Sequence, residues 1–283
     1  MTAYSNVALL LQGPLIDNRF LKNTKINLEF QNQLAYYKTL FDHIILSTYS
    51  EHVAALPQIQ SYCDQHNIML VHKSLDAGWR WPTTGTMWYQ TYTILNGLEH
   101  VSTSYVLKHR VDESYNNLHL VLDRFLQDTR KWVCGSMSIG PKIYRLYHPS
   151  DHLFITTTEL MRQTMQLTWD NLQKHTAENN NSGLKPDTDP NSYGPEITYA
   201  KNFLRCHGEV PTDDNHDQLM LQYFDFINDQ HLWPFVLRNN HARKYFTTIE
   251  ELGPNRLQYQ TINDLLTLKY APGHENYNYP NLI

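Results

Sequence analysis

Four charged side chains lie within six positions where an apolar run of the sequence ends. The segment reads Ser104-Tyr-Val-Leu-Lys-His-Arg-Val-Asp-Glu-Ser114, and its Tyr, Val and Leu have the character of a short buried strand. The charges that follow belong to Lys108, Arg110, Asp112 and Glu113. Because ligands bind at the carboxyl ends of strands in open α/β sheets, this group suits a diphosphate, held directly or through a divalent metal. A surface salt-bridge cluster at a strand exit is the alternative.

The composition is that of a globular chain with one large domain or two small ones. Of the 283 residues, 41% are hydrophobic and 18% are charged, which are ordinary values for such proteins. The formal net charge of −5 argues against a general nucleic-acid binder, because such proteins carry a basic excess. The 19 Tyr and 6 Trp offer flat faces with polar edges, which suit sugar rings and bases.

The cysteines and the N-terminal residues indicate the compartment. Cys63, Cys134 and Cys206 are widely spaced and form no CxxC pair, so they predict neither a zinc knuckle nor a disulfide framework. The apolar run from Val7 to Leu11 is too short for a membrane span and lacks the basic flank and cleavage site of a secretion signal. We therefore expect a cytoplasmic protein.

Strand-like and helix-like segments alternate through the first half of the chain. Short apolar runs predict strands, and apolar residues at helical spacing predict helices. The predicted strands cover residues 7–11, 43–48, 68–71 and 105–107. The predicted helices cover about 20–40, about a dozen residues after Pro57, and about 86–98. This alternation predicts an α/β fold with a mainly parallel central sheet flanked by helices.

The second half is less regular. Apolar runs predict two more strands, at residues 132–137 and 151–155. Helical spacing predicts three more helices, at 118–125, from Pro195 to just before Gly208, and at 219–227.

Residues 174–194 break this pattern. They are polar and contain Asn179-Asn-Asn-Ser-Gly183 and Lys185-Pro-Asp-Thr-Asp-Pro190, a composition typical of loops. A loop of this length in a compact domain is either a functional lid or a disordered insertion.

Several common catalytic patterns are absent from the sequence. The 15 histidines form no HExxH, HxH or compact His/Asp cluster. The chain also lacks a G-x-S-x-G elbow, a P-loop and a G-x-G-x-x-G fingerprint. These absences argue against nucleophilic esterases, NTPases and dehydrogenases.

Several short motifs occur in a fixed order along the chain. They are strand-QGP, strand-LSTY, KSLDAGW, a helix ending in NGLE, and YVLKHRVDE, followed by Ser150-Asp-His-Leu-Phe154 and Pro195-Glu-Ile-Thr-Tyr-Ala-Lys-Asn-Phe-Leu204. This series resembles the WavE-like lipopolysaccharide-synthesis proteins, a family of GT-A-type glycosyltransferases. The resemblance extends from about Val7 through His231. Its strongest element is Lys108-His-Arg-Val-Asp112, close to the family's K-x-R-x-D; the others are short.

The resemblance implies one compact GT-A-like domain built from two halves. Residues 1–135 would be the Rossmann-like half that binds the nucleotide-sugar donor. Residues 136–283, with the long loop 174–194, would be a smaller, mixed half that binds the acceptor. These bounds are an expectation.

The charged segment departs from the usual GT-A pattern. Typical GT-A enzymes carry an Asp-x-Asp that holds a divalent cation on the donor diphosphate, whereas here Arg110-Val-Asp112 occupies that place. The resemblance implies that Asp112 and Glu113 hold manganese or magnesium, while Lys108 and Arg110 contact phosphate. Alternatively, the two cations replace part of the metal's role, since the leaving nucleoside diphosphate must be neutralised either way.

Other donor-site candidates lie at the predicted ends of the first and third strands. Gln12, Gly13 and Pro14 either admit the nucleoside by a close backbone approach or form a plain turn. The GT-A comparison places a base- or ribose-binding acid at Asp76, which otherwise caps a helix. Arg80 would pair with phosphate.

Two carboxylates are candidates for the catalytic base. Inverting glycosyl transfer needs a carboxylate that accepts the proton of the acceptor hydroxyl. Glu196 follows Pro195 in the first turn of a predicted helix, where the helix dipole alone also favours an acid. Asp151 precedes a predicted strand and is the main rival.

Together, these observations predict a glycosyltransferase. It would transfer a sugar from a nucleotide-sugar donor to a hydroxyl of a growing surface glycan, of the lipopolysaccharide type. Its partners would be the donor and the glycan acceptor, with no nucleic acid and with membrane contact only through the acceptor. The alternatives are a non-catalytic carbohydrate-binding protein, favoured by the aromatic residues, and a metal-dependent phosphoesterase, favoured by the acids and histidines.

Overall fold

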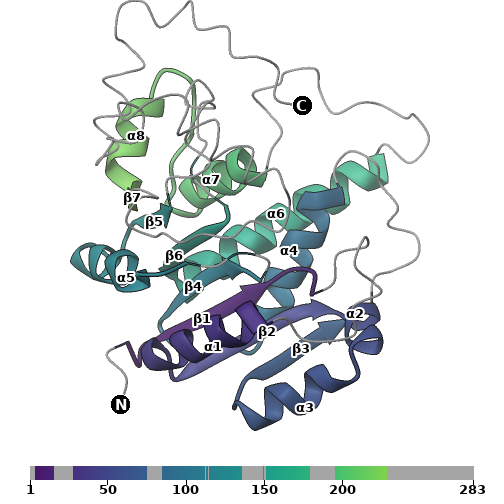
Figure 1. The fold of residues 1–283 in the computed structure, drawn as a ribbon. Helices are drawn as coiled ribbons and strands as arrows, with labels where there is room; N and C mark the ends of the chain where they lie inside the picture. The colour runs from purple at the N-terminus through teal and green to yellow at the C-terminus, as the bar shows by residue number, and fades with distance from the viewer. Residues whose placement is uncertain are drawn as a thin grey trace, which may run out of the picture.

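A single seven-stranded sheet forms the centre of the molecule (Figure 1). The structure is a computed structural model and describes residues 4–15, 28–74, 85–111, 113, 115–135, 149, 151–178 and 195–227. The order of the strands is β3-β2-β1-β4-β6-β5-β7. Their bounds are β1 Val7–Gln12, β2 His43–Tyr49, β3 Met69–Lys73, β4 Tyr105–Arg110, β5 Trp132–Gly135, β6 Leu153–Thr157 and β7 Phe224–Ile227.

The order in which the chain adds strands to the sheet reverses between β1 and β4. From β1 the chain adds β2 and then β3 on one side, and it returns to place β4 on the other side. These four strands are parallel, with Gln12 level with both Ser47 and Arg110. Such a reversal opens a crevice at the carboxyl ends of the two central strands, where ligands bind in open α/β sheets.

The antiparallel strand β6 brings a second segment to the same edge. It pairs with β4 so that Lys108 lies opposite Phe154 and His109 lies opposite Leu153. Because β6 runs against β4, it begins where β4 ends. The residues just before β6, Asp151 and His152, therefore lie beside the carboxyl end of β4.

Helices cover both faces of the sheet. Their bounds are α1 Leu28–Leu40, α2 Ser50–Ala55, α3 Gln58–Gln65, α4 Gly85–Leu98, α5 Leu118–Gln127, α6 Thr158–Glu178, α7 Pro195–Cys206 and α8 His216–Tyr223. Side chains alternate along each strand, so Leu10 and Val106 pack in one core with α4, α6, α7 and α8. Leu9 and Leu107 pack in the other core with α1, α3 and α5.

A close contact between α4 and the sheet requires a glycine. A Cβ atom at Gly97 would lie 2.3 Å from Leu10 Cδ1 and 3.1 Å from Ser47 Cβ. Ser47 also donates a hydrogen bond from its Oγ to the carbonyl oxygen of Thr93, at 2.6 Å. Gly97 thus allows α4 to lie directly on β1 and β2.

The structure confirms the predicted fold class, a mainly parallel sheet flanked by helices. Two predictions about elements were wrong, and two helices were missed. Residues 219–227 are not one helix, because α8 ends at Tyr223 and Ile227 lies in β7. The predicted loop begins later than residue 174, because α6 continues to Glu178; residues 179–194 lie outside the described residues. Neither α2 nor α6 was predicted.

The predicted division into halves 1–135 and 136–283 remains a prediction. Strands from both ranges join the same sheet, with β6 inserted between β4 and β5. Among the described residues, no helix is both long enough and apolar enough to cross a membrane.

Candidate functional site

The turn after β1 is fixed by hydrogen bonds to its neighbours. Gly13 has a φ of +126°, which a residue with a side chain rarely adopts. Its N–H donates to the carbonyl oxygen of Ser47 at 3.2 Å, and its carbonyl oxygen accepts from Thr48 Oγ1 at 2.9 Å. The N–H of Val111 donates to the carbonyl oxygen of Gln12 at 2.9 Å. The turns after β1 and β4 are therefore joined side by side.

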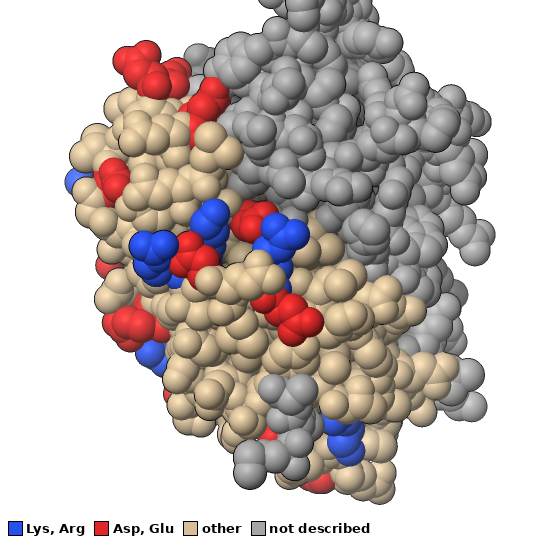
Figure 2. All heavy atoms as spheres, turned by 90° about the vertical axis from the view of Figure 1, so that its left-hand side faces the viewer, with Lys and Arg blue, Asp and Glu red and all other residues tan. Residues whose placement is uncertain are grey.

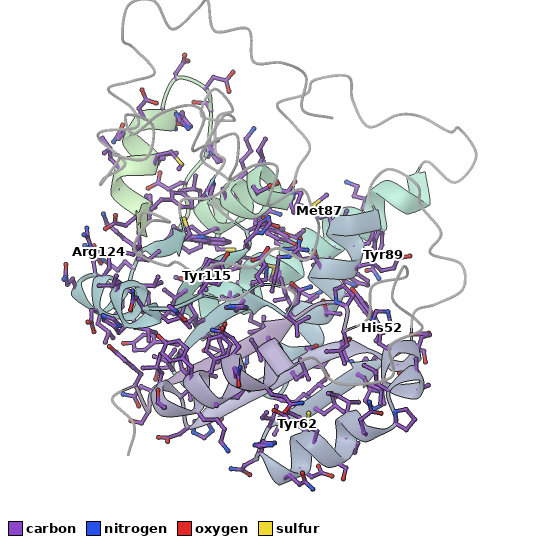
Figure 3. All side chains as sticks on the ribbon, in the orientation of Figure 1. His52, Tyr62, Met87, Tyr89, Tyr115 and Arg124 are labelled. Atoms are coloured by element: carbon purple, nitrogen blue, oxygen red, sulfur yellow. The ribbon has the colours of Figure 1, made fainter. Side chains whose placement is uncertain are left out.

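Aromatic side chains lie next to this turn, at the end of β2. The N–H of Leu15 donates to Nδ1 of His52 at 3.0 Å. The Tyr49 ring lies 5.2 Å from the ring of His52 and 6.0 Å from that of Tyr89, edge to face in both cases. Figure 3 shows His52 of α2 and Tyr89 of α4 on the same side of the molecule. These rings border the place predicted for the nucleoside.

Lys108 is buried and supports the segment that precedes β6. Its side chain is 0% exposed, and its ammonium donates to the carbonyl oxygens of Asp151 and His152, the latter at 3.4 Å. An ammonium in this place positions the two residues and does not face solvent. The predicted phosphate contact is therefore better suited to Arg110, which is partly exposed.

Arg110, Glu113 and His152 form a chain of charges at the edge. Oε1 of Glu113 lies 3.2 Å from Nε of Arg110 and accepts a hydrogen bond from Nδ1 of His152. Oε2 of Glu113 accepts from the hydroxyl of Tyr115 at 2.9 Å. Nε2 of His152 lies 3.5 Å from Oδ1 of Asp151. Both carboxylate oxygens of the buried Glu113 therefore have protein donors.

The charges in this chain shift two pKa values. Burial alone would raise the pKa of Asp151, but His152, Lys108 and Arg110, with the hydrogen bond from Gln90, lower it to about 2. Burial disfavours the protonated ring of His152, but the carboxylates of Glu113 and Asp151 outweigh it and raise the pKa of the ring above its ordinary value. Asp151 is thus a carboxylate at neutral pH.

Helices α4 and α7 complete the site above Asp151. Nε2 of Gln90 donates to Oδ2 of Asp151 at 2.7 Å, and the hydroxyls of Thr91 and Tyr199 share a hydrogen bond of 2.9 Å. Burial raises the pKa of Tyr199 well above its ordinary value, and the charges of Asp151 and Glu196 raise it further. Both candidate bases therefore lie within electrostatic reach of Tyr199, and Glu196 is 9% exposed.

The opposite face of β4 carries a second buried group, which joins the charged residues through the hydrogen bond from Tyr115 to Glu113. Nδ1 of His109 donates to the carbonyl oxygen of Arg110, so in the neutral ring Nε2 accepts from the hydroxyl of Tyr37, at 2.6 Å. The His109 ring also lies 4.9 Å from that of Tyr115, edge to face. The amide of Gln33 donates to the carbonyl oxygen of Tyr115 at 2.7 Å. This group packs on α1 and fixes the backbone of Arg110.

The donor set present does not fit the predicted metal site at Glu113. Both of its oxygens accept from Arg110, His152 and Tyr115, so a cation would have to displace these donors. Among the described residues, no group of three or more His, Cys, Asp or Glu is placed to hold a metal ion. Asp112, and likewise Asp76 and Arg80, lie outside the described residues.

The sequence did not single out Gln90, Tyr37 or Tyr115. The available signal for Gln90 was a polar residue between the apolar residues Trp88 and Ile94 of a predicted helix. No pattern in the sequence joins Tyr37 to His109, because they lie 72 positions apart along the chain. His152 was noted only as the neighbour of Asp151.

The surface beside α5 carries charges of both signs. Figure 2 shows the face at the left of Figure 1, where Lys and Arg side chains lie next to Asp and Glu. Ion pairs made by α5 and by the residues that follow it are Arg124 with Asp225 at 3.3 Å and Arg130 with Asp128 at 2.9 Å. The described part of this face carries no broad basic patch of the kind that general nucleic-acid binders have.

No protein-family model matches the chain, and no curated protein matches it. The resemblance to WavE-like proteins therefore remains an expectation. A solved structure from Bacillus anthracis, named as a glucose-1-phosphate thymidylyltransferase, is 8% identical, with a TM-score of 0.44, over 84% of this chain and 92% of that one.

Two other solved structures are similar at the same level. The glycosyltransferase GlyE of Streptococcus pneumoniae is 12% identical, with a TM-score of 0.41, over 74% of this chain and 45% of that one. A cytidylyltransferase of Leptospira borgpetersenii is 12% identical, with a TM-score of 0.38, over 72% of this chain and 95% of that one. Similarities at this level leave the assignment of activity to the geometry of the chain itself.

Proposed function

We propose that the protein is a glycosyltransferase that binds a nucleoside diphosphate-sugar at the carboxyl ends of β1 and β4. The observation that carries this proposal is the reversal of strand placement between β1 and β4. It coincides with the end of β1 at Gln12 and the end of β4 at Arg110, which are level in the sheet. A site at this point of an open α/β sheet takes a ligand in the crevice between the two strand ends.

The donor is proposed to lie across the two turns. The backbone of Gly13 and Pro14 borders the nucleoside, with the rings of Tyr49 and Tyr89 nearby. Arg110 contacts the diphosphate, because its guanidinium is partly exposed and a guanidinium can form bidentate pairs with phosphate oxygens. Asp76 and Arg80 keep their proposed contacts with the ribose and with phosphate.

A divalent ion is not needed to assign these roles. Glu113 is occupied as an internal acceptor, so a manganese or magnesium ion would fall to Asp112 and to the diphosphate itself. When bound, such an ion would neutralise the leaving diphosphate. No step below depends on it.

The proposed reaction breaks the bond between the anomeric carbon of the sugar and the diphosphate oxygen, which leaves with the electron pair. An oxygen of the glycan acceptor forms the new bond to the anomeric carbon, and its proton passes to a carboxylate. Glu196 suits this role better than Asp151, because a carboxylate with a pKa of about 2 is a weak base at neutral pH. Glu196 is buried in the first turn of α7 near Tyr199.

Titration calorimetry with UDP, GDP, CDP and dTDP, each with and without manganese, tests the donor site. We expect one of them to bind, and we expect Arg110→Lys to weaken that binding roughly tenfold, about 1.4 kcal/mol. The matched control is Arg124→Lys, whose guanidinium pairs with Asp225 beside α5. A parent protein that binds none of the diphosphates would refute the donor site, and unchanged affinity in Arg110→Lys would leave Arg110 as part of a salt-bridge cluster.

Transfer to a glycan acceptor tests the base. We expect Glu196→Gln to bind the donor normally and to lose transfer by about two orders of magnitude or more. If Glu196→Gln transfers sugar at the parent rate while Asp151→Asn binds the donor normally and does not transfer, the base is Asp151. Binding of glycan without any diphosphate would indicate a carbohydrate-binding protein, and phosphate release without an acceptor would indicate a phosphoesterase.

A further inference from the structure

Three buried acceptor atoms on the α4 face of the site make no hydrogen bond with the described residues. They are Oε1 of Gln12, Oε1 of Gln90 and Oδ1 of Asp151, none of which has a hydrogen-bond partner in the part of the chain that the structure describes; Oδ1 of Asp151 has only an ion-pair contact, at 3.5 Å from Nε2 of His152. The three residues are only 4%, 4% and 2% exposed, respectively. Buried polar groups are nearly always hydrogen-bonded, so three such atoms on one face of the sheet need an explanation.

The contacts around these residues place them on one face of the sheet, near the carboxyl ends of β1 and β4. Gln90 and Asp151 touch through the 2.7 Å hydrogen bond between Nε2 and Oδ2, and Nε2 also lies 3.4 Å from the backbone oxygen of Asp151. Gln12 is level in the sheet with Ser47, which is bonded to the Thr93 carbonyl oxygen, one turn of α4 from Gln90. Leu10 is the partner of Lys108 in the sheet, and Gln12 lies two residues beyond Leu10 along β1. Because side chains two positions apart on a strand share a face, Gln12 and Lys108 point to the same side of the sheet.

The chemistry of the three atoms restricts what they can bind. All three are acceptors, and one belongs to a carboxylate that is ionised at neutral pH. A phosphate offers mainly acceptors and negative charge, so it would be repelled. A group with several O–H donors would satisfy all three atoms at once. Of the positive groups nearby, Lys108 is engaged by backbone oxygens, and His152 is hydrogen-bonded to Glu113 through Nδ1 and lies 3.5 Å from Oδ1 of Asp151 through Nε2, too far for a good hydrogen bond.

We propose that Gln12, Gln90 and Asp151 form an acceptor-only subsite that binds hydroxyl groups on the sugar ring of the donor. This inference rests on the proposed function, because the nucleoside diphosphate would deliver the ring to this edge of the sheet. Asp151 then binds the substrate and does not accept the proton, which is consistent with Glu196 as the base. Arg110 and the acceptor subsite would divide the donor between them, the former on the diphosphate and the latter on the sugar.

The affinities of matched ligand pairs test the subsite. Titration calorimetry would compare UDP with UDP-glucose, GDP with GDP-mannose, and dTDP with dTDP-glucose, in the parent protein and in Asp151→Asn. Asparagine keeps an acceptor for Gln90 but places an N–H₂ donor at the position of Oδ1. We expect the nucleotide-sugar to bind about 10- to 100-fold more weakly, the range for a lost hydrogen bond to a charged group. The free diphosphate should keep its affinity within about twofold of the parent value.

Two further variants make the test decisive. Gln12→Met removes one orphan acceptor without removing any hydrogen bond that involves Oε1, and should weaken the nucleotide-sugar roughly threefold to tenfold. If circular dichroism shows that Asp151→Asn does not fold, the nucleotide-sugar affinity of Gln12→Met tests the subsite by itself. Asp225→Asn is the matched control, because its carboxylate pairs with Arg124 beside α5, and it should leave both ligands unaffected.

Each outcome bears on a different conclusion. A nucleotide-sugar affinity that does not change in Asp151→Asn and Gln12→Met overturns the subsite, and the three atoms then hold ordered water. An equal loss for the diphosphate and the nucleotide-sugar also overturns it, because the contact would not be with the sugar. A parent protein that binds neither class of ligand overturns the proposed function, and the inference with it.

Discussion

The two faces of β4 carry adjacent buried polar residues with opposite kinds of surroundings. On the α1 side, His109, Tyr37, Tyr115 and Glu113 form a closed network, in which donors and acceptors match. On the α4 side, Lys108, Asp151 and Gln90 form an open network, in which acceptors outnumber donors. Lys108 and His109 are neighbours in sequence, yet their side chains enter different cores, as the strand alternation requires.

The difference teaches how to separate support from recognition in a buried polar region. A closed network gains its full stabilisation in the folded protein alone, and it fixes the backbone of Arg110 from behind. An open network retains a cost of desolvation that a ligand removes when it binds. We therefore expect changes in the closed network to affect stability, and changes at the orphan atoms of the open network to affect binding.

Removal of the Lys108 ammonium should have the largest effect. In Lys108→Met the carbonyl oxygens of Asp151 and His152 lose their donor, and the Asp151 carboxylate loses a nearby cation. We expect the free energy of unfolding, measured in urea, to fall by about 3–5 kcal/mol. Lys73→Met is the control, because Lys73 is exposed and pairs with Glu99, and it should cost less than about 1 kcal/mol. Equal losses in the two variants would show that Lys108 is not a support.

The charge of Asp151 should appear in the pH dependence of stability. Because folding lowers the pKa of Asp151 from 3.8 to about 2, its contribution is present above about pH 4 and is lost as the pH falls towards 2. We expect a loss of about 2 kcal/mol over this range. His152 acts in the opposite sense, since its raised pKa gives stability below its ordinary 6.5 that is lost as the pH rises through the folded value. Urea titrations of Asp151→Asn should show a flatter acid limb than the parent, and an unchanged limb would contradict the assignment.

The closed network should respond to the loss of one hydroxyl. Tyr37→Phe leaves Nε2 of the buried His109 without its donor, which should cost about 1–2 kcal/mol. Tyr4→Phe is the matched control, because its hydroxyl bonds to Asp123 in an exposed place, and its loss should be smaller. Diphosphate affinity should be unchanged in both variants, whereas a tenfold loss in folded Tyr37→Phe would mean that the closed network also serves recognition.

A Gln→Met substitution beside each network should give the smallest effect, measured as the free energy of unfolding. Gln12 lies beside the open network, and Gln33 lies beside the closed one. Gln12→Met removes a buried oxygen that has no partner, so stability should change by less than about 1 kcal/mol and tend to rise. Gln33→Met removes the donor to the Tyr115 carbonyl oxygen, so stability should fall by about 1 kcal/mol. Equal effects in urea unfolding would mean that the two networks do not differ in this way.

Much of the sheet could be predicted from the sequence, because its strands are short apolar runs with clear boundaries. Val7–Gln12, His43–Tyr49 and Tyr105–Arg110 begin where the apolar pattern begins. β7 could not be predicted, because its four residues directly follow a helix and continue its apolar spacing. The reversal of direction at β6 is a tertiary property that no local pattern encodes.

Helix α6 escaped prediction because threonines occupy part of its buried face. Met161 and Met165 are buried, but so are Thr164 and Thr168 between and beyond them. Thr168 bonds to the carbonyl oxygen of Thr164 and accepts from the amide of Asn202 in α7, at 2.8 and 2.9 Å. Its apolar stripe is therefore interrupted, although the helix is fully packed.

The candidate site was predicted in part. The sequence located the charged segment at the end of a strand, and the structure places it beside the turn after β1. The sequence did not show that the ammonium of Lys108 is buried, or that Glu113 already has donors for both oxygens. Those facts depend on which face each side chain enters and on the antiparallel return of β6.

The close packing at Gly97 fixes the position of the C-terminal end of α4 on the sheet. The missing side chain of Gly97 lets the helix rest against Leu10 and Ser47, and Gln90 lies two turns away, about 10 Å along the axis. A methyl group at position 97 would push the C-terminal end of α4 away from the sheet and so shift its N-terminal end relative to the carboxyl ends of the strands. We therefore expect a side chain at position 97 to disturb the alignment of Gln90 with Asp151, two helical turns away.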